Sequence, residues 1–423
     1  METNIPNKYE KSSNNKYIVL NFEKIIGNHK KHTINNVDIN DENYTADFLI
    51  EINQGFISAG TNKEIIIYNK SYEKKTIEIE ENSFNNILEL DKIQNNNILV
   101  CLKDDLIIAD LNNISKLNLS LKKKIELNNI KFLLKIKKND FLICYENYAI
   151  TYANLLSDVL TYHMKIIDVK SIKSGIRLNS NFSALKVCNF ASRENNGIYF
   201  YSNTINKVIQ KKIIGKHYSF IYTMNGLTVI PSEEIESENK ILLCACKKYL
   251  KCQKNGILFI NIKFIVNNIH GININSHFYE TGNYEVYCFC PLFKIKEKKI
   301  INNEIIKEKT DFFLVGGFDQ NKKLGLIKLY KIIYESKFFN NRIEYIQDII
   351  IEKNELSKKE NKNYFEGFKG PISCIIQDQS NEKGNILITC WDGNVYILKL
   401  LNLDQYLEFD KQIKNNISFN KFF

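Results

Sequence analysis

The sequence predicts an all-β fold, and three observations support this class. A unit of two short apolar runs, separated by a polar turn, recurs seven times along the chain. Each run has the length of a strand and is rich in Ile, Val and Tyr, and each turn carries Asn, Asp, Gly or Lys. Hydrophobic residues make up 44% of the 423 residues, which is enough to bury a large core and excludes disorder, collagen and a simple coiled coil.

The spacing of the copies indicates how the strands are organised. The second runs of the first three copies begin at Ile65, Leu106 and Ala149, so these copies are 41 and 43 residues apart. Four-stranded propeller blades recur about every 40 to 45 residues, and loop insertions lengthen later copies without removing the blade. The later second runs begin at Ile198, Ile257, Leu326 and Val395. We therefore expect a seven-bladed β-propeller.

Flanking apolar runs supply the two remaining strands of each blade. Candidate innermost strands precede the repeated pair, as at 86–93 and 284–293, and candidate outer strands follow it, as at 75–80 and 342–351. The seventh copy is not followed by such an outer run. The run from Tyr17 to Ile26 is the candidate for this strand. Its pairing with the last blade would close the ring and remove an exposed sheet edge.

The last and first copies carry the clearest motif. Residues 369–376 and 386–398 combine an apolar strand, small residues, the Asp392-Gly393 turn and a second apolar strand, and 58–69 is the next best match. This pattern resembles the repeat of WD40 β-propellers. No copy ends in Trp-Asp, and no Gly-His pair precedes a first strand, so the resemblance is to a divergent propeller. The resemblance implies a rigid ring whose loops bind other proteins.

We expect one propeller domain over residues 17–410. A disordered N-terminus at 1–16 would precede it, and a C-terminal tail at 411–423 would follow it. Two charged segments, near 294–310 and 352–370, are typical of loops inserted at the surface.

The charge of the chain bears on its partners and its compartment. Lys and Arg total 58, and only Arg177, Arg193 and Arg342 are arginines, so 58 − 3 = 55 are lysines and the net charge is +10. Phosphate recognition favours the planar guanidinium group of arginine over the ammonium group of lysine. Nucleic acid or anionic membrane lipid is therefore the alternative partner rather than the expected one. The N-terminus lacks the pattern of a signal peptide, and no apolar run approaches the ~18 residues of a membrane helix, which indicates a cytoplasmic or nuclear protein.

Cysteine and histidine raise the question of a metal site, because Cys244, Cys246, Cys252, Cys288 and Cys290 lie close together in the sequence with two histidines between them. Cysteine also recurs at one phase of the repeat, in second strands, where other copies carry Ser, Ala or Gly. Small buried packing residues account for that recurrence. We therefore expect no metal and no cofactor. The sequence also lacks a Gly-x-Ser-x-Gly elbow, a phosphate loop and a His-Glu-x-x-His motif, so we expect no catalysis.

Candidate partner-binding residues lie in the turns between second and third strands and in a long connection between blades. Rigid blades would hold these loops on one face of the ring, so we expect binding energy to concentrate there. Arg193 is one of three arginines, and Arg is favoured at interface centres. For the aromatic pair at 364–365, packing between blades six and seven is the alternative. The candidates are Arg193, Glu194, Lys251, Gln320, Lys322, Tyr364 and Phe365.

Overall fold

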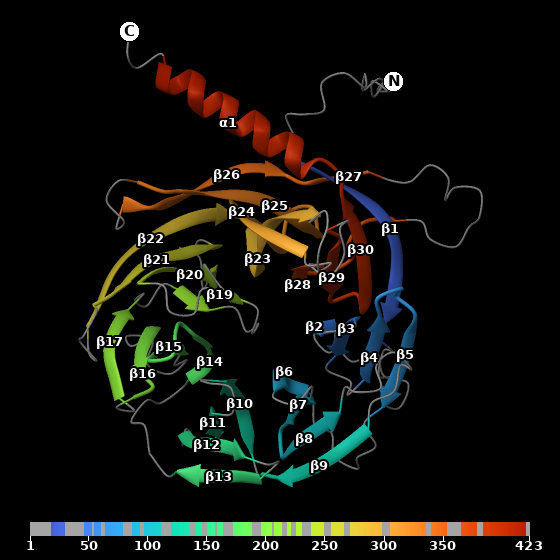
Figure 1. Ribbon diagram of the computed structural model, residues 1–423, viewed down its shortest axis with the longest axis vertical. Helices are drawn as coiled ribbons and strands as arrows, with labels where there is room; N and C mark the ends of the chain where they lie inside the picture. The colour runs from blue at the N-terminus through green and yellow to red at the C-terminus, as the bar shows by residue number, and fades with distance from the viewer. Residues whose placement is uncertain are drawn as a thin grey trace.

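Seven β-sheets surround a central axis in the computed structural model of the protein (Figure 1). The protein is a seven-bladed β-propeller, which confirms the fold predicted from the repeat. The structure describes residues 18–29, 46–52, 55–60, 64–78, 87–93, 97–110, 120–127, 129–135, 140–145, 150–156, 159–163, 172–187, 196–204, 207–213, 218–220, 226–230, 238–248, 255–265, 271–297, 305–335, 340–352, 365–378 and 384–419.

Each of the first four blades is a four-stranded antiparallel sheet whose strands pair in chain order, from the innermost to the outermost. The strands of blades one and two are β2 (Ala46–Ile52), β3 (Gly55–Gly60), β4 (Glu64–Asn69), β5 (Lys74–Glu78), β6 (Ile87–Ile93), β7 (Asn97–Leu102), β8 (Asp105–Asp110) and β9 (Ser120–Glu126). Those of blades three and four are β10 (Ile130–Lys135), β11 (Asp140–Tyr145), β12 (Ile150–Leu156), β13 (Val159–His163), β14 (Ile172–Arg177), β15 (Phe182–Val187), β16 (Gly197–Ser202) and β17 (Lys207–Ile213).

The last three blades have longer or additional strands. In blade five, two short strands pair with the same neighbour, and in blade seven the strand order is β27-β1-β30-β29-β28. The strands of blade five are β18 (Tyr218–Phe220), β19 (Leu227–Ile230), β20 (Asn239–Lys248), β21 (Asn255–Phe264) and β22 (Ile272–Gly282). Those of blades six and seven are β23 (Tyr284–Glu297), β24 (Ile305–Asp319), β25 (Leu324–Ile333), β26 (Arg342–Asp348), β27 (Ile350–Glu352), β28 (Ile372–Gln377), β29 (Ile386–Cys390), β30 (Asn394–Leu400) and β1 (Val19–Asn28).

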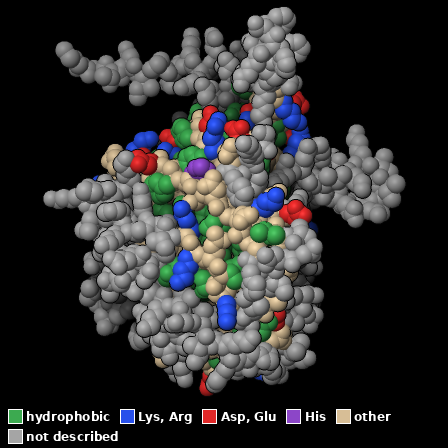
Figure 2. Space-filling model, turned by 90° about the vertical axis from the view of Figure 1, so that its left-hand side faces the viewer, with side chains coloured by type: hydrophobic (Ala, Val, Ile, Leu, Met, Phe, Trp, Pro, Cys, Tyr) green, Lys and Arg blue, Asp and Glu red, His purple; other side chains and the backbone are tan. Residues whose placement is uncertain are grey.

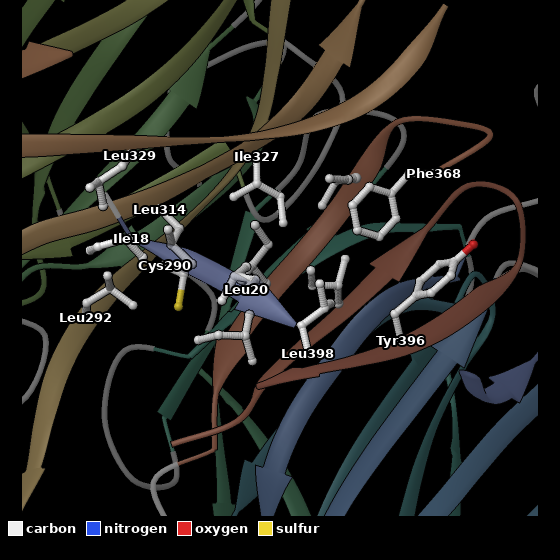
Figure 3. Packing of buried hydrophobic residues seen from close by; sticks show 14 of the residues in the cluster. Ile18, Leu20, Cys290, Leu292, Leu314, Ile327, Leu329, Phe368, Tyr396 and Leu398 are labelled. Carbon is white, nitrogen blue, oxygen red and sulfur yellow. The ribbon is translucent and has the colours of Figure 1, made fainter. Parts of the chain in front are cut away.

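The N-terminal strand closes the ring, as the sequence predicts. β1 pairs antiparallel with β30, from Leu20 opposite Leu400 to Asn28 opposite Asn394, and parallel with the short β27. Its apolar side chains enter the core between blades six and seven, where Ile18 and Leu20 lie among side chains of both blades (Figure 3). The first and last parts of the chain therefore complete the same sheet.

Neighbouring blades pack face to face, so their middle strands are buried on both sides. In blade one, Ile57 and Ile65 belong to a cluster with residues of blade two, whereas Phe56 and Ile66 belong to a cluster with Leu387 and other residues of blade seven. Successive side chains of a strand point to opposite faces. This explains why the middle strands are continuous apolar runs rather than alternating ones.

A buried polar network ties blade one to the closing strand. The Nε2 atom of His29 lies 3.0 Å from the Ser58 hydroxyl, which lies 3.2 Å from the Tyr68 hydroxyl, and the Glu64 carboxylate is 3.6 Å from the other ring nitrogen. A side chain at Gly27 would collide with the Tyr68 hydroxyl, only 2.0 Å from an added Cβ. Gly27 therefore allows Tyr68 to reach the network. The Gly-His motif does not reveal this network in the sequence, because Asn28 rather than glycine precedes His29.

The segment near 294–310 differs from the loop that its charge predicts. β23 continues to Glu297 and β24 begins at Ile305, and the two strands pair through Lys294 opposite Glu308 and Lys296 opposite Ile306. Lysine and isoleucine alternate over Lys294-Ile295-Lys296, and this period of two suits a strand. The charges therefore belong to an extended hairpin. Of the second predicted loop, 352–370, residues 353–364 lie outside the described residues, as does the predicted N-terminal segment 1–16.

A C-terminal helix replaces part of the predicted tail. α1 spans Leu403–Phe419 and lies at the outer edge of blade six (Figure 1). Its first turns pack on the propeller: Tyr406 contacts Phe312 edge to face, and Asp410 forms an ion pair with Lys331. Leu403, Tyr406 and Leu407 recur at the spacing of one helix face, which accounts for this docking. No helix in the described chain is long and apolar enough to cross a membrane.

We predict that ring closure dominates stability. Deletion of residues 1–30 removes β1 and exposes its partners in the core, and each large apolar side chain that β1 buries contributes about 1.5–3 kcal/mol. The thermal unfolding midpoint should then fall by on the order of 10 °C or more. Deletion of residues 1–16 is the matched control, because it leaves β1 intact. An unchanged midpoint in the longer deletion, measured by circular dichroism, would contradict closure by β1.

Candidate partner-binding face

The turns between second and third strands meet the connections between blades on one face of the ring. At blade two, the Asp104 carbonyl accepts a hydrogen bond from the Leu127 N–H at 2.6 Å, and its carboxylate accepts one from the Asn129 N–H at 2.9 Å. At blade six, the Gln320 N–H donates to the Asn283 carbonyl at 3.2 Å. We call this side of the ring the turn face. These bonds hold its loops in fixed positions relative to one another.

Gln320 covers a buried carboxylate on the turn face. Its side-chain amide donates to the Glu285 carboxylate at 2.6 Å, and the Tyr287 hydroxyl donates to the other carboxylate oxygen at 2.9 Å. Glu285 is only 3% exposed. Burial and the adjacent Glu285 carboxylate raise the pKa of Tyr287, so this phenol stays a hydrogen-bond donor at neutral pH.

The same network continues across three blades. The Tyr287 ring packs edge to face on Trp391 of blade seven, with 5.1 Å between ring centroids. The Trp391 indole N–H in turn donates to the Asp47 carboxylate of blade one at 3.1 Å. The only tryptophan of the chain thus fixes the relative positions of blades six, seven and one.

A second group of side chains lies where the turn face meets the outer side of blade six. The Asp348 carboxylate lies 3.4 Å from the Lys328 ammonium and 4.0 Å from the Lys322 ammonium, and it accepts a hydrogen bond from the Tyr345 hydroxyl at 3.0 Å. The Lys328 ammonium also lies 5.4 Å from the centre of the Tyr345 ring. Burial, followed by the hydrogen bond to Asp348, raises the pKa of Tyr345. The tyrosine therefore remains neutral and keeps this arrangement at physiological pH.

Two large apolar side chains of this region are exposed. Tyr345 is 49% exposed, and Leu324, which begins β25 directly after the turn, is 37% exposed. We call the group formed by Lys322, Leu324, Lys328, Tyr345 and Asp348 the blade-six corner. It combines exposed apolar surface with charges whose positions are set by their mutual contacts.

The structure brings two of the seven predicted partner-binding residues to this region. Lys322 belongs to the blade-six corner, and Gln320 lies two residues before it on the same turn. Four others lie outside the described residues, namely Arg193, Glu194, Lys251 and Tyr364.

Phe365 is a core residue rather than a surface anchor, which corrects its place among the candidates. It is 7% exposed, stacks on Phe22 of the closing strand at 5.0 Å, and meets Phe368 and Tyr396 edge to face. Its apolar ring is more stable between blades six and seven than in water. The alternative of packing between these blades is therefore the one observed.

Leu324, Lys328, Tyr345 and Asp348 are not among the predicted residues, because in the sequence they are ordinary strand residues. A bulge explains part of this. The register shifts between Leu329 and Tyr330, so that Gln347 and Tyr345 face consecutive residues of β25. As a result, both Glu344 and Tyr345 are exposed, which breaks the strict alternation of the strand. Two adjacent outward-facing residues in an outer strand leave no sequence signal of their own.

The described polar groups that could suggest chemistry have structural roles. Asp392 accepts hydrogen bonds from the Tyr396 hydroxyl at 2.5 Å and from the N–H groups of Asn394 and Lys369 at 2.9 and 3.2 Å. Among the residues that the structure describes, no group of three or more His, Cys, Asp or Glu is placed to hold a metal ion. The eight cysteines in this part of the chain are free and buried.

Comparison with known proteins defines the fold but not a family. No family model matches the sequence, and no curated protein is similar to it. The β-propeller domain of Cps50 (Swd1) from Myceliophteria thermophila is 6% identical to this chain and superimposes with a TM-score of 0.51. The alignment covers 85% of this chain and 98% of the Cps50 chain. The N-terminal domain of Nup159 is 10% identical, with a TM-score of 0.44. That alignment covers 91% of this chain and 97% of the Nup159 chain. At these identities the similarity concerns the fold alone.

Substitution of Phe365 should test its place in the core. We expect Phe365→Ala to lower the free energy of unfolding by about 3–5 kcal/mol, because it leaves a cavity beside Phe22. Glu366→Ala is the matched control. Its exposed ion pair with Lys369 contributes little, so its midpoint in a denaturant titration should stay close to that of the wild type. A Phe365→Ala variant as stable as the control would contradict the packing.

The cysteines should be unreactive in the native protein. Burial raises the pKa of Cys290 and of Cys374 to about 12, and that of Cys288 well above its ordinary value, so their thiols stay protonated at neutral pH. Eight of the ten cysteines are in the described chain, so we expect no more than 10 − 8 = 2 thiols to react with an alkylating reagent before unfolding. All ten should react in denaturant. Fast alkylation of more than two native thiols would contradict this prediction.

Proposed function

We propose that the protein is a non-catalytic platform that binds other proteins in a larger assembly in the cytoplasm or nucleus. A closed propeller supports this proposal because it holds many loops in fixed positions. The bonds between the turns and the connections at Asp104 and Gln320 reduce the freedom of those loops before a partner arrives. A partner that binds preorganised loops loses less conformational entropy than one that must order them.

The observation that carries the proposal is the blade-six corner. Tyr345 exposes apolar surface next to charges that already have partners, so contact with another protein would bury that surface without leaving a charge unpaired. Leu324 adds exposed apolar surface at the start of β25. Tyrosine is among the residues that typically carry most of the binding energy at an interface. The position of the Tyr345 ring is also fixed by Tyr330, which packs edge to face on it.

The polar groups of the turn face favour binding over chemistry. The Glu285 carboxylate is shared between Gln320 and Tyr287, and Asp392 is occupied by Tyr396 and two backbone groups. These two carboxylates thus stabilise the scaffold. We assign them the role of fixing the loops that a protein partner meets.

Substitutions in the blade-six corner test the proposal. A tagged wild-type chain should recover its partner proteins from the native organism, and Leu324→Ala and Lys322→Ala should reduce that recovery about tenfold, the effect of losing roughly 1.4 kcal/mol of binding energy. The unfolding midpoint should hardly change. Lys74→Ala and Thr76→Ala, on the exposed outer strand of blade one, are the matched controls and should recover partners like the wild type.

Two results would contradict this function. Both corner variants could retain every partner, or the recovered material could be nucleic acid or anionic lipid whose binding collapses with added salt, as expected when counterions are released. The second result would support the alternative of a basic propeller that docks on polyanions. Arg193→Ala and Tyr364→Ala, two of the remaining sequence-based candidates, extend the test to loops that the sequence predicts on the same face.

A further inference from the structure

The outer strand of blade five has an edge that lacks the usual protection. β22 (Ile272–Gly282) pairs with β21 on its inner side, and within the described chain no strand pairs with its outer side. The strand has eleven residues. A long, unpaired strand edge presents a row of backbone N–H and C=O groups to which another strand can add.

The other outer strands of the described blades carry at least one of three features that discourage such pairing. β5 and β13 are short, with five residues each. β9, β17 and β26 have seven residues each, and all three contain a register shift that bends the edge. Positive side chains add repulsion on four of these five strands, at Lys74, Lys75, Lys123, Lys124, Lys207, Lys211, Lys212 and Arg342.

β22 is long and carries no positive side chain, and its register shift is confined to its C-terminal end. It pairs with β21 through nine consecutive residue pairs, from Phe264 opposite Ile272 to Gly256 opposite Glu280, and the only register shift lies beyond them, at Asn255. Its sequence contains no Lys or Arg, and Glu280 is its one acidic residue. Figure 2 looks onto this side of the ring, where uncharged side chains and backbone fill the centre of the view and the positive side chains lie apart from one another.

We propose that β22 pairs antiparallel with β22 of a second copy of this chain, about a two-fold axis at Ser276. In this register Ile274 lies opposite Phe278 of the other copy, and both side chains are half-buried in the single chain, so pairing removes further apolar surface from water. Asn275 lies opposite His277, and Glu280 lies opposite Ile272. The interface is isologous, because each contact occurs twice.

The order of side chains in β22 favours a second copy as the occupant of the edge, because in this register the apolar Ile274 and Phe278 face each other. Self-pairing of β22 in this register places no like charges opposite each other, whereas self-pairing of β17 would gather three lysines of each copy in one interface. The net charge of +10 repels two copies at long range, but at physiological ionic strength this repulsion is screened beyond about 8 Å. The short-range pairing of backbone groups at the uncharged edge therefore decides the association.

Sedimentation velocity of the full chain over a wide concentration range tests the pairing. We expect a reversible monomer–dimer equilibrium for the wild type. Asn275→Lys/His277→Lys places two pairs of lysines opposite each other in the dimer, so its dissociation constant should rise at least about tenfold. Ser71→Lys/Thr76→Lys adds the same charge, 10 + 2 = +12, on the outer hairpin of blade one and should dimerise like the wild type.

Thermal unfolding of both double variants at low concentration establishes that each has folded. The proposal is overturned by a wild type that stays monomeric at every concentration, or by Asn275→Lys/His277→Lys dimerising as strongly as the wild type. These results do not test the proposed function of the blade-six corner, because the two surfaces belong to different blades. Partner recovery tests the corner, and sedimentation tests the pairing of β22.

Discussion

The pairing of β1 with β30 is the contact on which the rest of the ring depends. It joins residues that are 366 to 380 positions apart, from Leu20 opposite Leu400 (400 − 20 = 380) to Asn28 opposite Asn394 (394 − 28 = 366). Side chains reinforce it at its start, where Gln347 exchanges two hydrogen bonds with the backbone of Ile18 and Asn402 accepts one from the Val19 N–H. An open array of blades would leave one face of blades one and seven in water. Closure instead gives every blade two neighbours.

This two-sided packing explains the small residues that recur in second strands. Cys101, Cys144, Cys244 and Cys390 are buried there, and blade six carries Gly316 at the equivalent place. A Cβ at Gly316 would lie 2.6 Å from the Cys288 sulfur and 2.7 Å from the Ile372 side chain of the next blade. The blades approach too closely at these positions for larger groups. Cysteine acts there as a small apolar residue, which agrees with its buried position.

Charge is distributed by the same geometry. Because both faces of each middle strand are covered, the lysine excess is concentrated on outer strands such as β5, β9 and β17, where it also repels other sheet edges. Positively charged side chains that enter the interior find partners, as Lys331 does with Asp410 of the C-terminal helix. The blade-six corner, where the charges already have partners, and β22, which carries no lysine or arginine, are the two surfaces that we propose meet another protein chain.

The sequence by itself determined the blades, their number and their closure, because strand period, turn residues and a spacing near 41 to 43 residues are local properties of the chain. It also placed Gln320 and Lys322 on the turn face. Only the tertiary structure decided which aromatic residues are buried, since the position of Phe365 depends on Phe22, more than 340 residues away. The exposure of Tyr345 likewise depends on a bulge opposite Tyr330. The His29 network depends on residues from three strands and a connection. Burial and bulges arise from long-range packing, which a local pattern does not record.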